Sequence, residues 1–332
     1  MENMISVIVL TYNQEKTIAR TLDSILMQKC RLPYEIVIGD DCSTDTTRTI
    51  CEEYQQRYPS IIRLMKKAPN KGVIDNYFDT LLECKGTYIA DCAGDDFWTD
   101  GQKLEKEVCI LESNPDVTLV HTNWMYFNEK TQERTPCPDN PFGKPITNGK
   151  DMLEAIIVQT TSPIIHLCTA LYRKETLLKA YRENTFLFRN KDFGCEDLQI
   201  CFTLARMGKI AFMPDYTLNY SCGEETVSYS NDSAKQFRFV KRVTDLSHYL
   251  SKEYNIHSNN INRYFSQRLF ALSMHAFRGK DKALRTETIA CARKWNARIT
   301  PMTKAVLTVT SNKATWSVAL WLRKLFVRIK AI

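Results

Sequence analysis

Two runs of apolar, mostly β-branched residues near the start of the chain predict buried strands. The first is Ile5 to Leu10 and the second is Tyr34 to Gly39, and polar residues follow each run. The segments that come next, Thr17 to Met27 and Thr46 to Tyr58, repeat apolar residues at helical spacing. A strand and a helix that alternate in this way indicate parallel strands joined by crossover helices.

The alternation continues through the first hundred residues. Ile61 to Met65 predicts a third strand, Val73 to Cys84 a third helix and Thr87 to Cys92 a fourth strand. The chain thus begins βαβαβαβ, which predicts an α/β fold with a doubly wound, mostly parallel sheet flanked by helices. In such a sheet, ligands bind beyond the carboxyl ends of the strands.

The middle of the chain has a weaker pattern. Four prolines between Thr131 and Gly149 predict an exposed loop without regular structure. After this loop we expect a strand over Ile164 to Tyr172, a helix over Asp197 to Met207 and a short strand from Ile210 that ends at Pro214.

Amphipathic helical stretches dominate after Ser233. They cover Phe237 to Leu250, Tyr264 to Phe277 and Ala283 to Trp295. We therefore predict one α/β domain over residues 1–230, built from halves at 1–105 and 106–230, and a helical C-terminal region over 231–332.

Composition adds limits to this picture. Of the 332 residues, 44% are hydrophobic and 25% are charged, as in ordinary globular proteins. The 12 cysteines include no CxxC pair, which argues against a zinc site or a disulfide framework. No stretch reaches the roughly 18 uncharged apolar residues of a membrane-spanning helix, and Glu2 stands where a signal peptide would be basic. We expect a cytoplasmic protein, either soluble or peripheral on the inner face of the membrane.

Polar clusters follow three of the predicted strands. They are Thr11, Tyr12 and Asn13 after the first, Asp40 to Asp45 after the second, and Gly94, Asp95 and Asp96 after the fourth. In a parallel sheet these turns converge on one edge. Neither GxGxxG nor GxxxxGK[ST] occurs, which disfavours dinucleotide dehydrogenases and P-loop enzymes.

The acidic pair Asp95 and Asp96 predicts a metal site. Carboxylates repel the phosphates of a nucleotide directly, so a divalent cation has to lie between them. The alternative is that the two acids only cap a helix that we expect to run from Thr99.

Four ordered motifs in the first 105 residues resemble those of the family 2 glycosyltransferases of the GT-A fold: SVIVLTYN, EIVIGDDCSTDTT, NKGVIDN and GTYIADCAGDDFWTDGQKL. The resemblance implies a GT-A-like domain with a nucleotide-binding half at 1–105 and an acceptor half at 106–230. It implies that the base and ribose of a nucleotide are held by Thr11, Tyr12, Asn13, Asp40 and Asp41, and that the nucleotide is covered by the stretch with Asn70, Gly72 and Asn76.

The resemblance also assigns roles to the acids. Ala93 to Asp96 stand where the family has Asp-x-Asp, often extended to DADD, so the leading carboxylate is missing. Asp95 takes the position of the nucleotide and metal ligand, Asp96 is a second metal ligand, and the expected cofactor is Mn²⁺ or Mg²⁺.

Glu196 and Asp197 resemble the family's Glu-Asp motif, in which a carboxylate deprotonates the acceptor hydroxyl. Asp197 is the expected base and Glu196 the second choice. The alternative is that both acids only complement the dipole of the helix that they open. The family's Arg or His near Leu218 to Cys222 is missing, and so is the QxxRW motif of processive synthases.

The basic excess, a formal charge of +7, gathers at the end of the chain in residues 313–332. The residues that share one apolar side of a helical wheel there are Ala314, Val318, Trp321, Leu322, Leu325 and Ile329. This is typical of a helix lying in an anionic membrane interface, and a terminal helix packed on the domain fits equally well. Basic residues form no stripe in the first domain, so we expect no nucleic-acid partner.

The predicted function is an inverting transfer of one sugar from a nucleotide diphosphate donor, with a UDP-sugar expected, to a saccharide or lipid-linked acceptor in bacterial surface polysaccharide or glycolipid assembly. One alternative is a glycosyltransferase-like binding or scaffold protein without activity, which Ala93 motivates. Another is a nucleotidyltransferase, which would need a basic glycine-rich phosphate loop that this sequence lacks.

Overall fold

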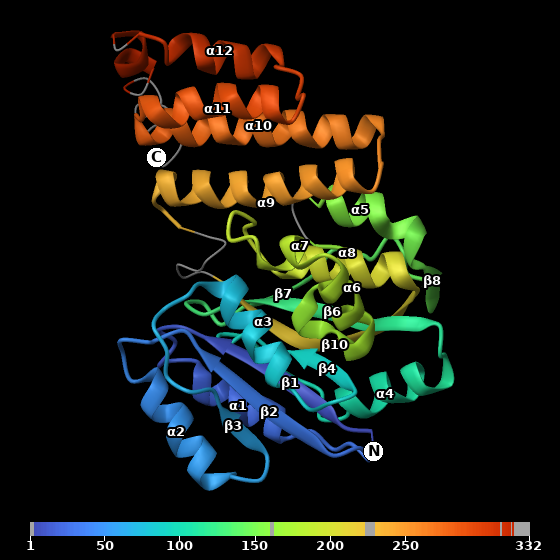
Figure 1. Cartoon of the computed structure of the whole chain (residues 1–332). Coiled ribbons are helices and arrows are strands. Elements are labelled where there is room, and N and C mark those ends of the chain that lie inside the picture. The colour runs from blue at the N-terminus through green and yellow to red at the C-terminus, as the bar shows by residue number, and fades with distance from the viewer. Residues whose placement is uncertain (1–2, 160–162, 223–229, 313, 320, 322–332) are drawn as a thin grey trace. The chain divides into compact units, whose positions relative to one another are not determined.

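The computed structural model describes residues 3–159, 163–222, 230–312, 314–319 and 321 (Figure 1). The chain divides into two compact units. The first comprises Met1–Lys191 and Cys195–Gly223, and the second comprises Asp192–Gly194 and Glu224–Ile332.

The first unit is built on one mixed sheet with the strand order β3-β2-β1-β4-β9-β6-β10-β5, and β7 and β8 pair with β6 and β10. The strands are β1 (Ile5–Thr11), β2 (Tyr34–Asp40), β3 (Ile62–Leu64), β4 (Tyr88–Asp91), β5 (Phe97–Trp98), β6 (Val117–Asn128), β7 (Arg134–Pro136), β8 (Ile146–Asn148), β9 (Leu171–Arg173) and β10 (Lys209–Cys222). The helices are α1 (Ile18–Leu26), α2 (Thr47–Arg57), α3 (Val73–Glu83), α4 (Lys103–Ser113), α5 (Leu153–Ile157), α6 (Lys174–Glu183), α7 (Thr185–Arg189) and α8 (Asp197–Met207), with short 3₁₀ turns η1 (Gly149–Met152) and η2 (Leu167–Thr169).

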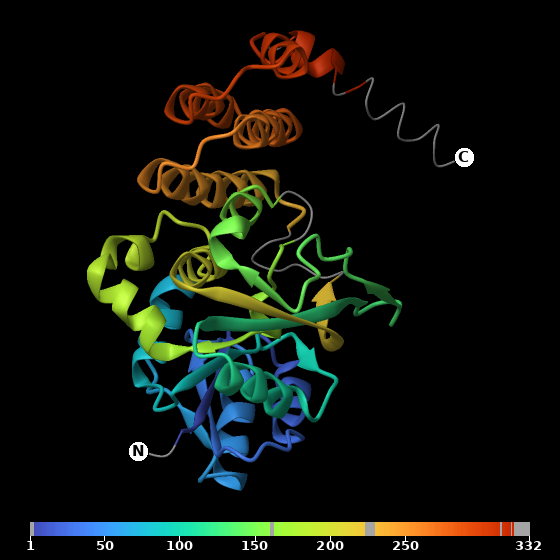
Figure 2. The same cartoon turned by 90° about the vertical axis from the view of Figure 1, so that its right-hand side faces the viewer.

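The sheet is parallel where the sequence predicted it. β3, β2, β1 and β4 run parallel, and the short antiparallel β9 joins β4 to β6. The two longest strands, β6 and β10, pair in parallel and lie side by side in Figure 2. Alternate residues of β1, such as Val7 and Val9, pack in one core with α1, α2 and α4, while α3 covers β1 and β2 from the other face. The predicted doubly wound α/β architecture is confirmed.

The helix expected from Thr99 begins four residues later, at Lys103. Thr99 continues the pairing of β5 with β10 instead: its amide donates to Thr217 O (2.9 Å) and its hydroxyl to Tyr216 O (3.1 Å). Asp100 then starts the turn into α4 by accepting the amide of Gln102 (2.8 Å). The acids at 95 and 96 therefore do not cap this helix.

The prediction of a proline-rich loop without regular structure over 131–149 was partly wrong. Arg134–Pro136 pairs with the end of β6, and Ile146–Asn148 pairs with the start of β10. Both strands are three residues long and lie at sheet edges, where a proline that lacks an N–H group is tolerated.

Two other predicted strands have different bounds. Of the strand expected over Ile164–Tyr172, only the end is a strand, as part of β9. The chain before it forms a turn in which Thr169 donates to His166 O through both its amide (2.9 Å) and its hydroxyl (2.7 Å). The strand expected to end at Pro214 continues to Cys222. A register shift between Met213 and Tyr216 carries it past the proline.

The second unit consists of helices with their own buried apolar residues. They are α9 (Ser233–Glu253), α10 (Asn259–Gly279), α11 (Lys282–Lys294) and α12 (Pro301–Val309). Side chains of Asp232, Ser258, Asp281 and Thr300 cap their N-termini. The predicted helical C-terminal region is confirmed over these residues.

Most of the basic terminal helix that we predicted over 313–332 lies outside the described residues. In the described part, Trp316 is buried and its Nε1 donates to Phe277 O (3.0 Å), while Val318 and Trp321 are 57% and 60% exposed. No helix in the described ranges combines the length and the apolar character needed to cross a membrane.

Candidate active site at the carboxyl edge of the sheet

Polar contacts tie the turn after β1 to the turn after β2. The amide of Asn13 donates to Ser43 Oγ (2.9 Å), and Asn13 Oδ1 accepts the Thr44 amide (2.8 Å). The Gln14 amide donates to Thr47 Oγ1 (2.7 Å). The two polar clusters therefore meet at the carboxyl edge of the sheet, as the sequence predicted.

Asp40 and Asp41 are buried, and each holds a turn in place. Asp40 Oδ1 accepts the amide of Ser43 (3.2 Å) as well as its hydroxyl. Asp41 accepts the amides of Lys71 (2.9 Å) and Gly72 (3.0 Å), one on each oxygen. A nucleotide at this point would have to use the lone pairs that these bonds leave over.

The stretch expected to cover the nucleotide is fastened to the end of β2. Asn70 Nδ2 donates to Asp41 O (2.9 Å), and Asn76 Nδ2 donates to Gly39 O (2.7 Å) from a side chain that is only 3% exposed. Gly72 has a φ of 84°, a left-handed conformation that favours glycine. Asn76 thus has a structural task, and its contact with a nucleotide stays a prediction.

The chain after β4 passes tightly against the end of β1. A Cβ atom on Gly94 would lie 2.4 Å from Gln14 Oε1 and 2.9 Å from Thr11 Oγ1, so no larger residue fits at 94 without movement. Thr11 is buried, and its hydroxyl has no hydrogen-bond partner in the part of the chain that the structure describes. Tyr12 is 48% exposed and offers a ring surface at this edge.

Asp95 is half-buried, and Asp96 is almost wholly buried. Asp96 Oδ1 accepts the amide of Ser221 (2.9 Å), while its Oδ2 has no hydrogen-bond partner among the described residues. Burial and then the charge of Asp95 raise the pKa of Asp96 well above its usual range, and burial raises the pKa of Asp95. A nearby cation would favour the ionised form of both carboxyls.

These residues fit a divalent cation held mainly by Asp95, because Asp96 is turned inward to Ser221. Among the described residues, no group of three or more His, Cys, Asp or Glu side chains could hold a metal ion. A cation at Asp95 would therefore complete its shell with phosphate oxygens of a substrate and with water, as Mg²⁺ does.

Arg20 of α1 is a charged neighbour of Asp95 that the sequence analysis missed. Its Nη2 donates to Asp95 O (3.1 Å) and to Ser221 Oγ (3.3 Å), and its guanidinium lies 4.1 Å from the centre of the Phe97 ring. Glu129 pairs with the same guanidinium (Nη2 to Oε1, 2.5 Å) and offsets much of its charge. Nothing in the local sequence marks Arg20, because its role depends on residues far away in the chain.

Glu196 and Asp197 stand at the N-terminus of α8, and both are half-buried. Burial and then the charge of Asp197 raise the pKa of Glu196 well above its usual range. Burial also raises the pKa of Asp197, but a hydrogen bond with the Glu196 carboxyl opposes that rise. The two carboxyls therefore titrate as a coupled pair whose pKa values are both raised by burial.

The two acidic pairs lie within electrostatic reach of each other. The charge of Asp197 helps to raise the pKa of Asp96. Cys168 is affected by both pairs: its Sγ accepts the Ala93 amide (3.4 Å), and burial first, then charges that include those of Asp96 and Asp197, raises the pKa of its thiol.

The comparison with known families decides the identity. A family model described as "Glycosyl transferase family 2" matches residues 6–179, a range that holds every motif named above except the Glu-Asp pair. The chain belongs to glycosyl transferase family 2.

Individual related proteins are similar in sequence to this chain over parts of its length. An uncharacterised protein of Mycobacterium tuberculosis is 42% identical over 114 residues, which cover 34% of this chain and 33% of the relative. The glycosyltransferase EpsE of Bacillus subtilis is 35% identical over 163 residues, or 47% of this chain and 58% of EpsE. The chain thus matches about a third of the length of the first relative and nearly three fifths of EpsE.

Solved structures of two glycosyltransferases have the same fold. The Staphylococcus aureus TarS fragment 1–349, in complex with UDP-GlcNAc, has a TM-score of 0.55 at 18% identity and covers 94% of this chain and 91% of that one. The mannosyltransferase PcManGT of Pyrobaculum calidifontis, in complex with GDP-Man and Mn²⁺, has a TM-score of 0.50 at 20% identity over 94% of this chain and 87% of its own.

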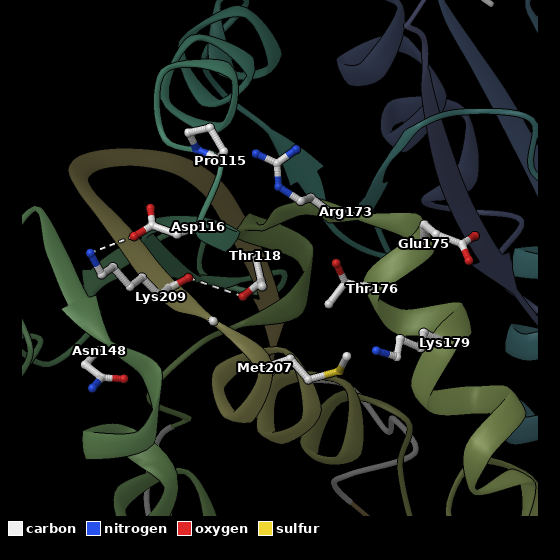
Figure 3. A pocket seen from close by; sticks show the side chains of 11 residues that line it. Pro115, Asp116, Thr118, Asn148, Arg173, Glu175, Thr176, Lys179, Met207 and Lys209 are labelled. Atoms are coloured by element: carbon white, nitrogen blue, oxygen red, sulfur yellow. Dashed lines mark hydrogen bonds and ion pairs between the residues drawn. The ribbon is translucent and has the colours of Figure 1, made fainter.

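A cavity of about 550 Å³ lies at the opposite edge of the family 2 domain, where β6 and β10 begin (Figure 3). Several of the polar side chains that line it are engaged in contacts within the chain. Arg173 Nε donates to Val117 O (2.8 Å), and Lys209 pairs with Asp116 (2.6 Å). Its position and contacts do not connect it to the donor chemistry.

Burial controls the protonation of two histidines of the first unit. His121 is buried without a hydrogen-bond partner among the described residues, and burial lowers its pKa to about 3. Burial lowers the pKa of His166 to about 4, and its ring lies 4.7 Å from that of Tyr220. Both are neutral packing side chains at neutral pH. Trp98 is buried too, and its Nε1 donates to Cys168 O (3.0 Å).

Proposed function

We propose that this chain moves one sugar from a nucleotide diphosphate donor to an acceptor hydroxyl with inversion, using a divalent cation at Asp95 and Asp197 as general base. The observation that supports the proposal is that the charge of Asp197 helps to raise the pKa of Asp96, so the aspartate signature and the Glu-Asp motif lie within electrostatic reach of each other. The fold and the family membership supply the context.

The donor end of the proposed site is the cluster of turns after β1, β2 and β4. Tyr12 offers an exposed ring, and Asp40 and Asp41 keep unused lone pairs next to it. We infer a UDP-sugar, since TarS binds UDP-GlcNAc on the same fold; PcManGT, which binds GDP-Man, makes a GDP-sugar the second choice.

The charge balance at Asp95 favours metal dependence. The cation nearest to the aspartates among the described contacts, Arg20, is paired with Glu129, so little positive charge is left for a leaving diphosphate. A divalent cation held by Asp95 would neutralise the charge that develops on that diphosphate. The Mn²⁺ present with PcManGT supports the same choice of cofactor, and Mg²⁺ is the alternative.

The chemistry is a single displacement. The acceptor oxygen forms a bond to the anomeric carbon while the bond from that carbon to the diphosphate oxygen breaks, and its electron pair leaves with the nucleotide diphosphate. The acceptor's hydroxyl proton passes to Asp197, whose pKa is raised by burial and held back from a larger rise by the hydrogen bond with the neighbouring Glu196 carboxyl. One base and one stabilised leaving group suffice, so the product has inverted stereochemistry.

The acceptor and the location remain inferences from chemistry. The names of the similar proteins, which include a poly(ribitol-phosphate) N-acetylglucosaminyltransferase, favour a surface polysaccharide or a lipid-linked saccharide. No Asp or Glu follows Glu287, and Val318 and Trp321 are exposed, which supports peripheral attachment of residues 313–332 to an anionic membrane on its inner face. We keep the domain bounds 1–230 and 231–332 for this assignment.

The rival proposal is a binding or scaffold protein without transferase activity. Ala93 supports it, because this residue replaces the first acid of the signature. Asp95 and Asp96 favour the enzyme, since a scaffold has no need for carboxyls whose burial raises their pKa values.

A donor screen tests the choice. We expect one nucleotide sugar to raise the melting temperature only when Mn²⁺ or Mg²⁺ is present, and the same donor to be hydrolysed or transferred slowly. Asp95→Ala should abolish both effects, and the matched control Asp116→Asn, at the far edge of the sheet, should keep them. A donor that binds equally well without metal and is never turned over would support the scaffold instead.

A further inference from the structure

The segment that carries Asp95 and Asp96 runs between two strands and belongs to neither. β4 ends at Asp91 and β5 begins at Phe97, and the strand pairings on either side stop at these residues. The buried carbonyl oxygens of residues 94–96 therefore need hydrogen-bond donors from outside the sheet. These donors decide how firmly the two acidic residues are held.

The first turn of α1 and the residue that precedes this helix supply the donors. Their side chains reach successive carbonyl oxygens: Thr17 Oγ1 donates to Gly94 O (2.8 Å), Arg20 Nη2 to Asp95 O (3.1 Å) and Thr21 Oγ1 to Asp96 O (2.6 Å). Thr21 is wholly buried, so water does not replace its hydroxyl. The peptide groups around both acidic residues are thus fixed from one helix.

The contacts continue along the same side of the helix. Ser24 Oγ accepts the amide of Trp98 (3.0 Å), and Gln28 Nε2 donates to Asp100 O (2.7 Å). The residues that make these contacts recur at the spacing of one helical face, and we call them the polar stripe of α1: Thr17, Arg20, Thr21, Ser24 and Gln28. The apolar side chains beside the stripe, Ile18, Leu22 and Ile25, pack in the core and anchor the helix.

Arg20 is itself held in place. Its Nη2 lies 2.5 Å from Glu129 Oε1 and donates to Ser221 Oγ (3.3 Å). Its guanidinium lies 4.1 Å from the centre of the Phe97 ring, at the start of β5. These neighbours restrict the rotamers of Arg20, so its hydrogen bond to the main chain costs little further side-chain entropy.

Ser221 of β10 completes the hold on the acidic pair. Its hydroxyl donates to Asp95 O (2.6 Å), and its amide donates to Asp96 Oδ1 (2.9 Å). The Asp96 carboxyl is thereby turned inward, while the main chain of Asp95 is held from α1 and from β10. These hydrogen bonds favour Asp95 as the carboxyl that meets a ligand.

The hold on residues 94–96 bears on metal binding, because a metal ligand has to stay within about 0.5 Å of its working position. We propose that the polar stripe of α1, through Thr17, Arg20 and Thr21, positions Asp95 for the divalent cation by fixing the carbonyl oxygens of residues 94–96. This inference rests on the proposed function. The three residues do not touch the cation; they are positioning residues that act through the main chain.

Arg20 gives the proposal a direction of effect that charge alone would reverse. Its positive charge repels a cation at Asp95, so removing that charge, which also leaves Glu129 unpaired, would by itself strengthen Mn²⁺ binding. Losing the hydrogen bond to Asp95 O would instead loosen the carboxyl and weaken Mn²⁺ binding. The variant Arg20→Met thus separates positioning from electrostatics.

Thr21 and Gln28 supply matched variants. Thr21→Val keeps the shape of the side chain and removes the donor to Asp96 O, whereas Thr21→Ser keeps the hydroxyl. Gln28→Met removes two hydrogen bonds of the same stripe, one to Asp100 O and one from the Leu104 amide (3.1 Å), and spares those to residues 94–96. Thr21→Val and Gln28→Met should both lower the free energy of unfolding, because each leaves polar groups unpaired. Only a positioning role predicts that they differ in metal binding.

The first test measures the Mn²⁺ concentration that gives half-maximal binding of UDP, by isothermal titration, with GDP as a second probe. We expect this concentration to rise about 10-fold in Thr21→Val and in Arg20→Met, and to keep the wild-type value in Thr21→Ser and Gln28→Met. An unchanged or lower value in Thr21→Val and Arg20→Met, or an equal rise in Gln28→Met, would overturn the positioning role.

Hydrogen exchange of the free protein, followed by mass spectrometry, tests the hold on the segment without metal, nucleotide or turnover. In the wild type the Gly94 amide donates to Leu10 O (2.9 Å) and the Asp96 amide donates to Ala93 O (2.9 Å). A segment that opens more often exposes these amides to exchange.

We expect peptides that cover residues 93–98 to exchange faster in Thr21→Val and Arg20→Met than in the wild type and Gln28→Met. Equal exchange in all four proteins would overturn the proposal, whatever the protein catalyses. Faster exchange in the two variants, combined with a wild type that binds neither UDP nor GDP with Mn²⁺, would instead overturn the proposed function and, with it, the role of the polar stripe in metal binding.

Discussion

Two groups of acidic residues in the first unit differ in how their carboxyl oxygens are hydrogen-bonded. The first group, Asp40 and Asp41, lies at the end of β2. The second group comprises Asp91, Asp95 and Asp96 at and after the end of β4, and Glu196 and Asp197 at the start of α8. Asp41 accepts two backbone amides, and Asp40 accepts an amide and a hydroxyl. Asp96 has one oxygen without a partner among the described residues, and Asp91 has none for either oxygen. In the first group both Asp41 oxygens are hydrogen-bonded, and Asp40 Oδ2, which accepts no hydrogen bond from the described residues, has Arg48 Nη1 at 3.7 Å. The second group has carboxyl oxygens that are buried without a donor among the described residues.

This difference distinguishes carboxylates that stabilise the fold from carboxyls that we assign to the reaction. Hydrogen-bonded carboxylates fix the turns that a nucleotide would contact, and they need no ligand to be stable. Carboxyls that are buried without donors have raised pKa values, and they gain stability only from a proton or a cation. The second group is therefore where we place the metal and the base.

Replacing the base should have the largest effect. Asp197→Asn removes the proton acceptor, so we expect the transfer rate to fall by about 10³-fold, while donor binding is unchanged. Initial rates with the donor found in the screen measure this. Asp116→Asn at the opposite edge is the control, and a loss of similar size there would show that both variants act through folding.

In the first group, Asp41→Ala should lower the free energy of unfolding by roughly 2–3 kcal/mol, because the amides of Lys71 and Gly72 lose a charged acceptor. Denaturant unfolding of the variant and the wild type gives this value. A variant as stable as the wild type would mean that Asp41 does not hold the Lys71–Gly72 turn and would weaken the comparison.

In the second group, removing a carboxyl charge should raise the free energy of unfolding instead of lowering it. The pKa of Asp96 is raised in the folded protein, so the stability that its proton confers is present at acidic pH and is lost as pH rises through that raised pKa. In the presence of a chelator, Asp96→Asn should therefore be more stable than the wild type at neutral pH, by less than Asp41→Ala loses. Equal stability at pH 3 serves as the internal control, and a less stable variant at neutral pH contradicts the assignment.

The smallest effect concerns the link between the first two turns. Ser43→Ala removes the hydroxyl that accepts the Asn13 amide and donates to Asp40, and we expect a loss of about 1 kcal/mol in unfolding free energy. Thr44→Ser keeps a hydroxyl near Asn13 and is the conservative comparison. A loss much larger than that of Asp41→Ala would reverse the ranking.

Local patterns predicted the first half of the fold closely. β1, β2, α2 and α3 begin and end within about two residues of their expected bounds, because buried parallel strands and amphipathic helices carry their period in consecutive residues. β6 was missed, since His121, Thr122 and Asn123 interrupt its apolar run. The passage of β10 beyond Pro214 depends on a register shift that no local pattern encodes.

The candidate site was predictable where motifs carry it. The sequence located the acids at 95, 96, 196 and 197 and the turns after the first two strands. It could not reveal that Asp41 accepts two backbone amides, or that Arg20 donates to the carbonyl oxygen of Asp95. These facts depend on contacts between residues that are tens of positions apart, so only the folded chain displays them.

The most direct test of the account separates donor binding from turnover in two variants. Isothermal titration with the donor, with and without Mn²⁺, and transfer rates under the same conditions should be measured for the wild type, Asp95→Asn and Asp197→Asn. We expect metal-dependent binding and turnover in the wild type, neither in Asp95→Asn, and metal-dependent binding without turnover in Asp197→Asn. Full turnover by Asp197→Asn, or unchanged metal-dependent binding by Asp95→Asn, would contradict the assignment of the metal and the base to this edge of the sheet.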